Sequence, residues 1–423
     1  MYMIVVGLAL VCILSLFTKR FTISLFSGIW IVALLFVGNE QFEALNFISV
    51  QAIVVMLIST FIGFFLSKYK FVIDHSFAVY DNLYETGSDK TVIKEKILRC
   101  LLVVCLLIFG IYFLITIRNA GSFNLAIIRS LNASNSDTSA FKGNFDTLLY
   151  YVIAQPIFTV TAIAVVYTFF TRQRLKRSTM IVFFVDFLVY LFTNGGRVFV
   201  ICVGCFALAG VFRTLMIRGK ERLNLKFVML IVIALITVLT LMTNSRTGNG
   251  ITFIRQVREY IGCSIVQMDQ EILNISSHRN GSINFGYFTY GGFLYYPIKI
   301  INMILGINIQ APSEYFNYLQ TFRTINFAGR NVYYNALVPN AFYYYFDSGM
   351  LGVCVFSLIA GYIQGKYETW IKKVFSFKNF AFYAISVYSL LFSPMGSQAW
   401  KIFIPLSIVW CIIINRFIGD NHG

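Results

Sequence analysis

Residues 101–117 read LLVVCLLIFGIYFLITI, an apolar run that contains no charged side chain. As a helix, a run of this length nearly crosses a hydrocarbon core roughly 30 Å thick. Similar runs recur from one end of the chain to the other, and no soluble domain flanks them. Because helices are one of only two structures that satisfy backbone polar groups in lipid, the pattern predicts an all-α polytopic membrane protein.

The composition of the chain fits the same class of protein. Hydrophobic residues make up 58% of it and charged residues 12%, whereas about 25% of a soluble domain is charged. We therefore expect about eleven transmembrane helices in a single transmembrane domain over residues 1–423. The expected spans are 2–17, 21–38, 48–66, 99–117, 148–171, 178–194, 197–213, 227–243, 341–363, 379–393 and 401–416.

The basic residues predict the orientation of these spans. With the amino terminus outside, 22 of the 34 lysines and arginines fall on the cytoplasmic side. The loop 67–98 is then cytoplasmic, and the loops 118–147 and 244–340 are external. The inner set contains 13 lysines and 9 arginines and the outer set 3 lysines and 9 arginines, so the outer arginines need a separate explanation. The net charge of +16 suits anionic headgroups and does not indicate nucleic acid.

The stretch 244–340 is the longest interruption of the apolar pattern. It contains six arginines, nine tyrosines and one lysine, which favours planar recognition of phosphate or carboxylate. Apolar residues between Ile251 and Leu273 recur with a period near 3.6 and predict an amphipathic helix on the membrane surface. Residues 292–309 are apolar but short and broken by Pro297, which predicts a re-entrant or interfacial segment.

Four arginines are candidates for anion binding. Arg197 follows the Gly195-Gly196 turn between two expected spans, where it either binds an anion or extends to lipid headgroups. Arg246 lies at the outer end of the eighth span. Arg255 and Arg258 are three residues apart on one helix face, where they either clamp a pyrophosphate or attract anionic lipid.

The sequence around residue 330 adds two further candidate site residues, Arg330 and Asp347. Gly329 to Leu337 read GRNVYYNAL, and Asp347 follows two turns into the next apolar span. A carboxylate at that depth is unfavourable without a polar partner, so Asp347 either pairs with an arginine or acts as a general base. His278 is the one histidine of the stretch, and it is either solvated or an acid–base group. No zinc-site, P-loop or serine-nucleophile motif is present, so we expect neither a metal nor a cofactor.

These features resemble the Wzy-type oligosaccharide repeat-unit polymerases of bacterial O-antigen and capsule synthesis. The resemblance rests on the eleven or so spans, the Gly-Gly-Arg turn and the arginine-bearing external loop. It also rests on GRNVY from Gly329 and YYFDSGMLG from Tyr344. It covers the whole architecture, whereas the specific motifs cover about a tenth of the chain.

The resemblance implies a GT-C-like membrane glycosyltransferase of the bacterial inner (plasma) membrane, with its active site on the external or periplasmic face. The enzyme would transfer a growing glycan from undecaprenyl or another polyprenyl pyrophosphate to the non-reducing end of a second lipid-linked repeat unit, without a metal. Membrane lipid and a chain-length regulator protein are further implied partners. Arg197, Arg246, Arg330 and Asp347 match the family's catalytic positions best. We expect substrate contacts from Arg255, Arg258, Arg279, His278, Tyr290, Tyr333 and Tyr334.

Two alternatives remain from the sequence. An O-antigen ligase, which transfers the glycan to lipid A core, has the same architecture, and a functional external histidine such as His278 would favour it. A lipid-linked oligosaccharide flippase or another transporter is the second alternative. A flippase should carry cationic residues deep within its spans and internal repeats, whereas the arginines here cluster outside and no repeat is visible.

Overall fold

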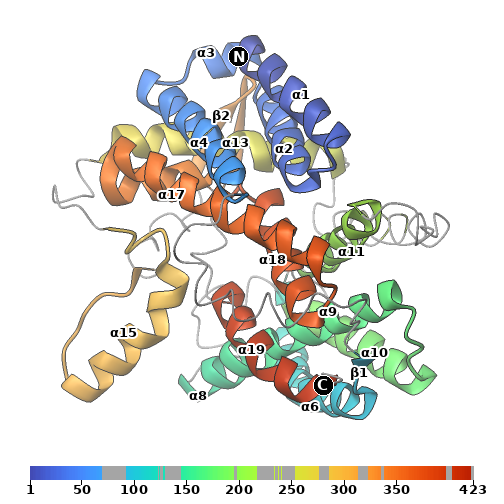
Figure 1. The fold of residues 1–423 in the computed structure, drawn as a ribbon. Coiled ribbons are helices and arrows are strands. Elements are labelled where there is room, and N and C mark those ends of the chain that lie inside the picture. The colour runs from blue at the N-terminus through green and yellow to red at the C-terminus, as the bar shows by residue number, and fades with distance from the viewer. Residues whose placement is uncertain are drawn as a thin grey trace. The chain divides into compact units, whose positions relative to one another are not determined.

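The computed structural model describes residues 1–68, 92–121, 123, 127–128, 144–194, 198–216, 233, 237, 240, 253–275, 285–312, 323–334, 338–396 and 403–420. These residues are mostly helical, with two small two-stranded sheets among them. The chain divides into two compact units (Figure 1). The first comprises Met1–Gly87, Ile254–Lys373 and Ser386–Pro405, and the second Ser88–Phe253, Val374–Ile385 and Leu406–Gly423.

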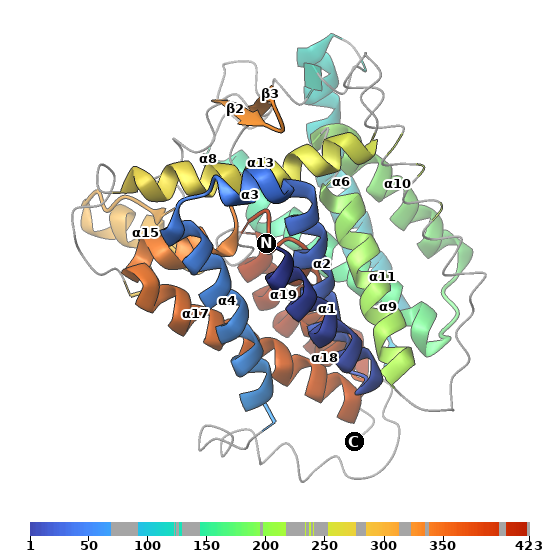
Figure 2. The same cartoon turned by 90° about the horizontal axis from the view of Figure 1, so that it is seen from above.

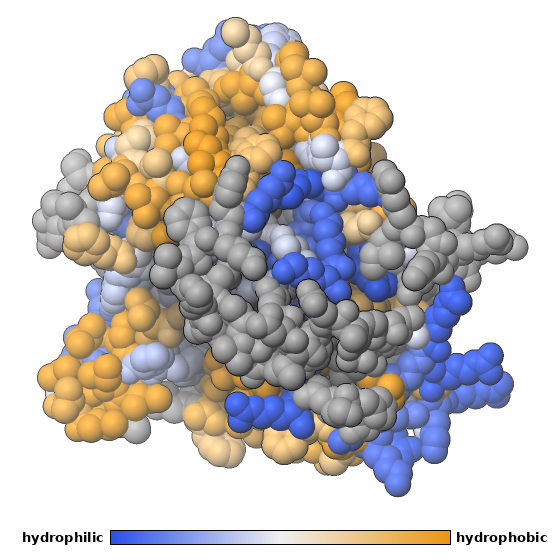
Figure 3. All heavy atoms as spheres, in the orientation of Figure 1, coloured by the Kyte–Doolittle hydropathy of each residue, from blue (hydrophilic) through white to orange (hydrophobic). Residues whose placement is uncertain are grey.

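The first unit is built from apolar helices and one β-hairpin. Its elements are α1 (Tyr2–Phe17), α2 (Phe21–Val37), α3 (Asn39–Glu43), α4 (Phe47–Leu66), α13 (Phe253–Leu273), α15 (Gly291–Leu305), β2 (Arg323–Phe327), β3 (Arg330–Tyr334) and α17 (Asn340–Lys373). Helix α18 (Phe377–Leu391) contributes its last residues, from Ser386 onward, to this unit. Apolar side chains cover the faces of α1, α2 and α4 that are in view in Figure 3, as expected for surfaces that contact lipid.

The second unit is also helical. Its elements are β1 (Val92–Ile93), α6 (Glu95–Ala120), α8 (Asn144–Thr147), the π-helix η2 (Leu148–Ala154), α9 (Gln155–Thr171), α10 (Arg177–Asn194), α11 (Val198–Met216), most of α19 (Phe403–Ile418) and β4 (Gly419–Asp420). Strands β1 and β4 pair antiparallel, so the residues before α6 are joined to the carboxyl-terminal end of α19. Tyr167 donates to the carbonyl of Phe375 at 2.8 Å, which fixes α9 against the segment that precedes α18.

The apolar runs predicted the helices well. Every expected span except 227–243 coincides with a helix, and 227–243 lies almost entirely outside the described residues. Among the described residues, six helices are long and apolar enough to cross a membrane: Phe47–Leu66, Glu95–Ala120, Leu148–Thr171, Arg177–Asn194, Val198–Met216 and Asn340–Lys373. This supports an all-α membrane protein, whereas the number of eleven spans stays a prediction. Helix α1, with 16 residues, reaches only about 24 Å at 1.5 Å per residue.

Helix α17 packs more extensively on α4 than on any other described element. Glycines make this close approach possible. A Cβ atom on Gly63 would lie 2.1 Å from the carbonyl oxygen of Leu358, and one on Gly361 would lie 2.2 Å from that of Thr60. A Cβ on Gly365 would likewise meet Ser67. The two backbones therefore cross at a distance that only glycine permits, as in the small-residue interfaces of membrane helices.

The turn after α18 joins three further segments of the first unit. Trp30 of α2 donates through its indole N–H to the Ser393 hydroxyl at 3.0 Å, and the backbone N–H of Asn340 donates to the Ser393 carbonyl at 3.0 Å. Ser264 of α13 donates to the carbonyl of Pro394 at 2.6 Å. This turn therefore fixes the start of α17 and the middle of α13 relative to α2.

We expect a side chain at Gly361 to destabilise the first unit. Gly361→Ala places a methyl group against the Thr60 carbonyl, and overpacking of this kind costs about 1–3 kcal/mol. Gly28→Ala in α2 is the matched control, because no atom lies within 4 Å of the added Cβ and Ala favours a helix over Gly by up to about 1 kcal/mol. Thermal unfolding in detergent should show a lower midpoint for Gly361→Ala alone. Equal midpoints for the two variants would contradict the close crossing.

Candidate functional site

Helix α17 is broken directly after Asp347. Its 34 residues would extend about 51 Å as a straight helix, but Ser348 (φ −149°, ψ 26°) and Gly349 (φ 61°, ψ −147°) interrupt it. The conformation of Gly349 is one that residues with a Cβ rarely adopt. The break gives the segment 340–347 a direction of its own and places Asp347 at the end of that segment, fully buried.

The Asp347 carboxylate holds the turn 285–290. Its Oδ1 accepts from the backbone N–H of Phe288 at 3.0 Å, and its Oδ2 accepts from that of Thr289 at 2.7 Å. The Phe288 ring packs edge-on against Phe346 with 4.8 Å between the ring centroids. Hydrogen bonds to an ionised acceptor are stronger than neutral ones, so this acid anchors the turn to the broken helix. The sequence predicted a polar partner for Asp347, and these two backbone amides are such partners, while its pairing with an arginine stays a prediction.

Tyr290 ends this turn and begins α15. Its ring packs edge-on against Phe356 of α17 with 5.9 Å between centroids. Burial raises the pKa of Tyr290, and the negative charge of Asp347 raises it further. The phenol is therefore neutral at neutral pH and can donate or accept a hydrogen bond. Its expected contact with substrate stays a prediction.

Helix α15 starts at this anchored turn. The helix forms even though Pro297 lies inside it, and its 15 residues extend only about 22 Å, too short to cross a membrane. Ile300, Ile304 and Leu305 are exposed along it. A short helix with exposed apolar residues agrees with the predicted re-entrant or interfacial segment, whose position in the membrane stays a prediction.

Helix α13 is the amphipathic helix that the sequence predicted, but protein covers both of its faces. Every residue from Ile261 to Met268 is buried. Ile265 and Met268 belong to the core that α2, α4 and α17 share, whereas Cys263 and Val266 pack against the hairpin β2–β3. In Figure 2 the hairpin lies to one side of α13, and α4 and α17 lie to the other. The middle of α13 is thus a packed core helix and not a helix with one face in water. The sequence could not show this, because the covering hairpin is distant along the chain.

The hairpin presents Arg330 at its tip. Strands β2 and β3 pair in the register Phe327↔Arg330 and are joined by Ala328 (φ 51°) and Gly329 (φ 72°), as in a tight turn with two left-handed residues. Arg330 is exposed. The sequence does not predict these strands, because Ala328-Gly329 is not one of the residue pairs that mark a two-residue hairpin turn, although apolar residues alternate on both sides of it.

The two hairpin tyrosines point to opposite faces. Tyr333 is 76% exposed, whereas Tyr334 is buried and donates to the carbonyl of Tyr260 at 3.1 Å. Burial raises the pKa of Tyr334. Tyr334 therefore binds the hairpin to α13, and Tyr333 is the better placed of the two for a substrate contact.

Arg255 and Arg258 lie near the start of α13, and both are exposed. The Nε of Arg255 forms an ion pair with Glu259 at 2.9 Å. The Nε of Arg258 donates to the carbonyl of Phe36 at 3.3 Å, and its guanidinium lies 5.9 Å from the centre of the Phe327 ring. The two side chains thus have different protein partners, and a joint pyrophosphate clamp stays a prediction.

Four expected site residues lie outside the described residues: Arg197, Arg246, His278 and Arg279. The described part of the predicted site therefore consists of Asp347 with its turn and of α13 with its hairpin. In that part of the chain, no group of three or more His, Cys, Asp or Glu side chains is arranged to hold a metal ion.

Comparison with protein families, with curated proteins and with solved structures finds no match to this chain.

We expect Asp347→Asn to loosen the turn 285–290. An amide has one oxygen and cannot accept both backbone N–H groups as the carboxylate does, and an unsatisfied buried donor costs about 1–3 kcal/mol. Asp269→Asn is the control, because Oδ1 of Asp269 accepts from the Asn46 N–H at 2.9 Å and an amide oxygen can take its place. Hydrogen exchange should show loss of protection at Phe288 and Thr289 in Asp347→Asn. Unchanged protection there would contradict the anchoring role.

The cover that the hairpin forms over α13 can be tested through Cys263. Burial, and to a smaller extent the charge of Glu259, raises the pKa of this thiol to about 12. We expect native protein to resist maleimide at Cys263 at neutral pH, because little thiolate forms and the sulfur is covered. Phe327→Ala removes part of the cover and should raise the labelling rate at least about tenfold. Tyr333→Ala on the exposed face should not. Rapid labelling of native Cys263, located by mass spectrometry, would refute the packing.

Proposed function

We propose that this chain is a membrane glycosyltransferase that polymerises lipid-linked oligosaccharide repeat units on the external face of a bacterial plasma membrane. The growing glycan passes from polyprenyl pyrophosphate to the non-reducing end of a second lipid-linked unit. The acceptor hydroxyl oxygen bonds to the anomeric carbon, the bond from that carbon to the pyrophosphate oxygen breaks, and the hydroxyl proton passes to a base or to solvent.

One observation carries the proposal: exposed arginines project from a rigid support in a membrane protein. Arg330 is exposed at the tip of the hairpin β2–β3, and one face of this hairpin packs on α13. Arg258 is exposed near the start of α13. Charge develops on the pyrophosphate as it leaves, and guanidinium groups that are already in place stabilise that charge with little reorganisation. A rigid support is what such an arrangement requires.

Asp347, Tyr333 and two further arginines have additional roles in this proposal. Asp347 holds the turn 285–290 and so positions Tyr290, while its assignment as a general base stays a sequence prediction. Tyr333, exposed on the hairpin, offers a ring and a hydroxyl to a sugar. Arg197 and Arg246 belong to the proposed site on the evidence of the sequence.

We expect Arg330→Ala, Arg197→Ala or Arg246→Ala to replace long polymer by single repeat units in cells. Loss of one group that stabilises transition-state charge lowers the rate by about 10²–10³-fold. We expect membrane insertion to be unchanged in all three variants; for Arg330 the reason is that its side chain is exposed. Gel analysis of polysaccharide length, with immunoblots of the variants, checks this result.

Arg174→Ala is the matched control, since this residue is expected on the cytoplasmic side. Normal polymer length in all three external variants would refute the arginine mechanism. Loss of glycan attached to lipid A core, with polymer of normal length, would instead favour the ligase. Failure of repeat units to reach the external face would favour the flippase.

A further inference from the structure

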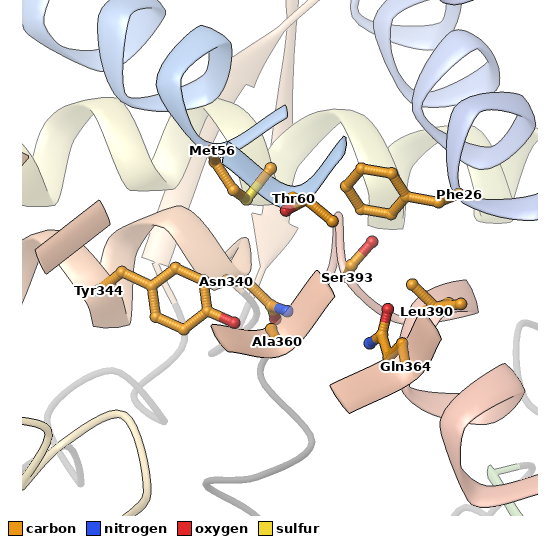
Figure 4. A pocket seen from close by; sticks show the side chains of 9 residues that line it. All are labelled: Phe26, Met56, Thr60, Asn340, Tyr344, Ala360, Gln364, Leu390 and Ser393. Carbon is orange, nitrogen blue, oxygen red and sulfur yellow. The ribbon is translucent and has the colours of Figure 1, made fainter. Parts of the chain in front are cut away.

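The first unit contains a small pocket between helices. Figure 4 shows its lining, which α2, α4, α17 and the end of α18 with its turn contribute. Apolar side chains on its wall include Phe26, Met56 and Leu390. The polar ones are Thr60, Asn340, Tyr344, Gln364 and Ser393. Each of these polar groups is neutral, so the pocket suits a neutral ligand that forms hydrogen bonds.

Two buried side-chain oxygens at the pocket accept no hydrogen bond from the described residues. The Ser393 hydroxyl accepts from the Trp30 indole N–H at 3.0 Å. Asn340 Oδ1 and Gln364 Oε1 are buried and have no hydrogen-bond partner among the described residues. A buried carbonyl oxygen without a donor is unfavourable, so both oxygens favour an occupant that donates hydrogen bonds.

The size of the pocket decides which donor fits. The cavity volume is about 10 Å³, close to the roughly 10–15 Å³ that one water molecule needs. A sugar ring is therefore too large, whereas a single O–H group is not.

We propose that this pocket binds one O–H donor, a water molecule, which donates to both Asn340 Oδ1 and Gln364 Oε1. The two residues lie on opposite sides of the break at Ser348 and Gly349. The bound water therefore connects the two halves of α17 across the interruption of their own hydrogen-bond ladder. This proposal does not depend on the proposed function.

The same O–H chemistry has a second source, a hydroxyl of a bound substrate. A structure of wild-type protein in nanodiscs, at a resolution that shows ordered water, distinguishes the two sources. We expect density for one water between Asn340 and Gln364 in protein purified without oligosaccharide. Density that appears only with a lipid-linked oligosaccharide would assign the donor to the substrate. A pocket that is empty in both preparations would overturn the proposal.

A double-mutant cycle tests the shared donor independently. Gln364→Met and Asn340→Leu each remove one acceptor and should each lower the unfolding midpoint, because the water loses one partner. In the double variant the loss should be clearly smaller than the sum of the two single losses. If the pocket holds no donor, Gln364→Met should instead raise the midpoint, because it removes an unsatisfied oxygen, and the two effects should add.

Ser357→Ala is the control for this cycle. The Ser357 hydroxyl is also buried without a hydrogen-bond partner among the described residues, and it lies on α17 outside the pocket lining. Its substitution should not lower the midpoint and should add to the effect of Gln364→Met. Coupling between Ser357 and Gln364 as strong as that between Asn340 and Gln364 would overturn the shared donor.

Discussion

The close crossing of α4 and α17 is the constraint on which the first unit depends. Lipid is as apolar as the side chains it surrounds, so membrane helices associate through close packing and polar contacts and gain little from the hydrophobic effect. At Gly63 and Gly361 the backbones themselves are in contact, because any Cβ would meet a carbonyl oxygen. This contact fixes the second half of α17. The break at Ser348 and Gly349 then allows the first half to follow a different direction.

The other parts of the candidate site follow from that broken helix. Asp347 ends its first half and binds the turn 285–290 through two backbone amides. The turn after α18 fixes the start of α17 and, through Ser264, the middle of α13. Helix α13 then supports the hairpin that bears Arg330. A buried framework thus carries the exposed guanidinium groups, an arrangement suited to binding a charged group without reorganisation.

The sequence predicted the helices because each apolar run is a local signal: its residues must be buried in lipid or in the protein core, and a helix satisfies their backbone hydrogen bonds there. It also placed the amphipathic pattern of α13 correctly, with Ile261, Ile265 and Met268 on one face. It did not predict the burial of the opposite face, since Phe327 and Tyr334 come from a hairpin some sixty residues later. The break in α17 was equally hidden, because Ser348 and Gly349 occur within many continuous membrane helices. For the site, Asp347 was correctly expected to need a polar partner, but only three-dimensional contacts could identify the backbone amides of the turn 285–290.

Because the chain is synthesised from its amino terminus, α4 is made well before the helix α17 that packs on it. Gly63 of α4 and Gly361 of α17 are separated by about 300 residues. A ribosome needs roughly 15–60 s to add these residues at about 5–20 residues per second. During that interval α4 is in the membrane without the helix that completes its packing. The surface of α4 around Gly63 is uncovered until then, so this close crossing can form only after most of the chain has been made.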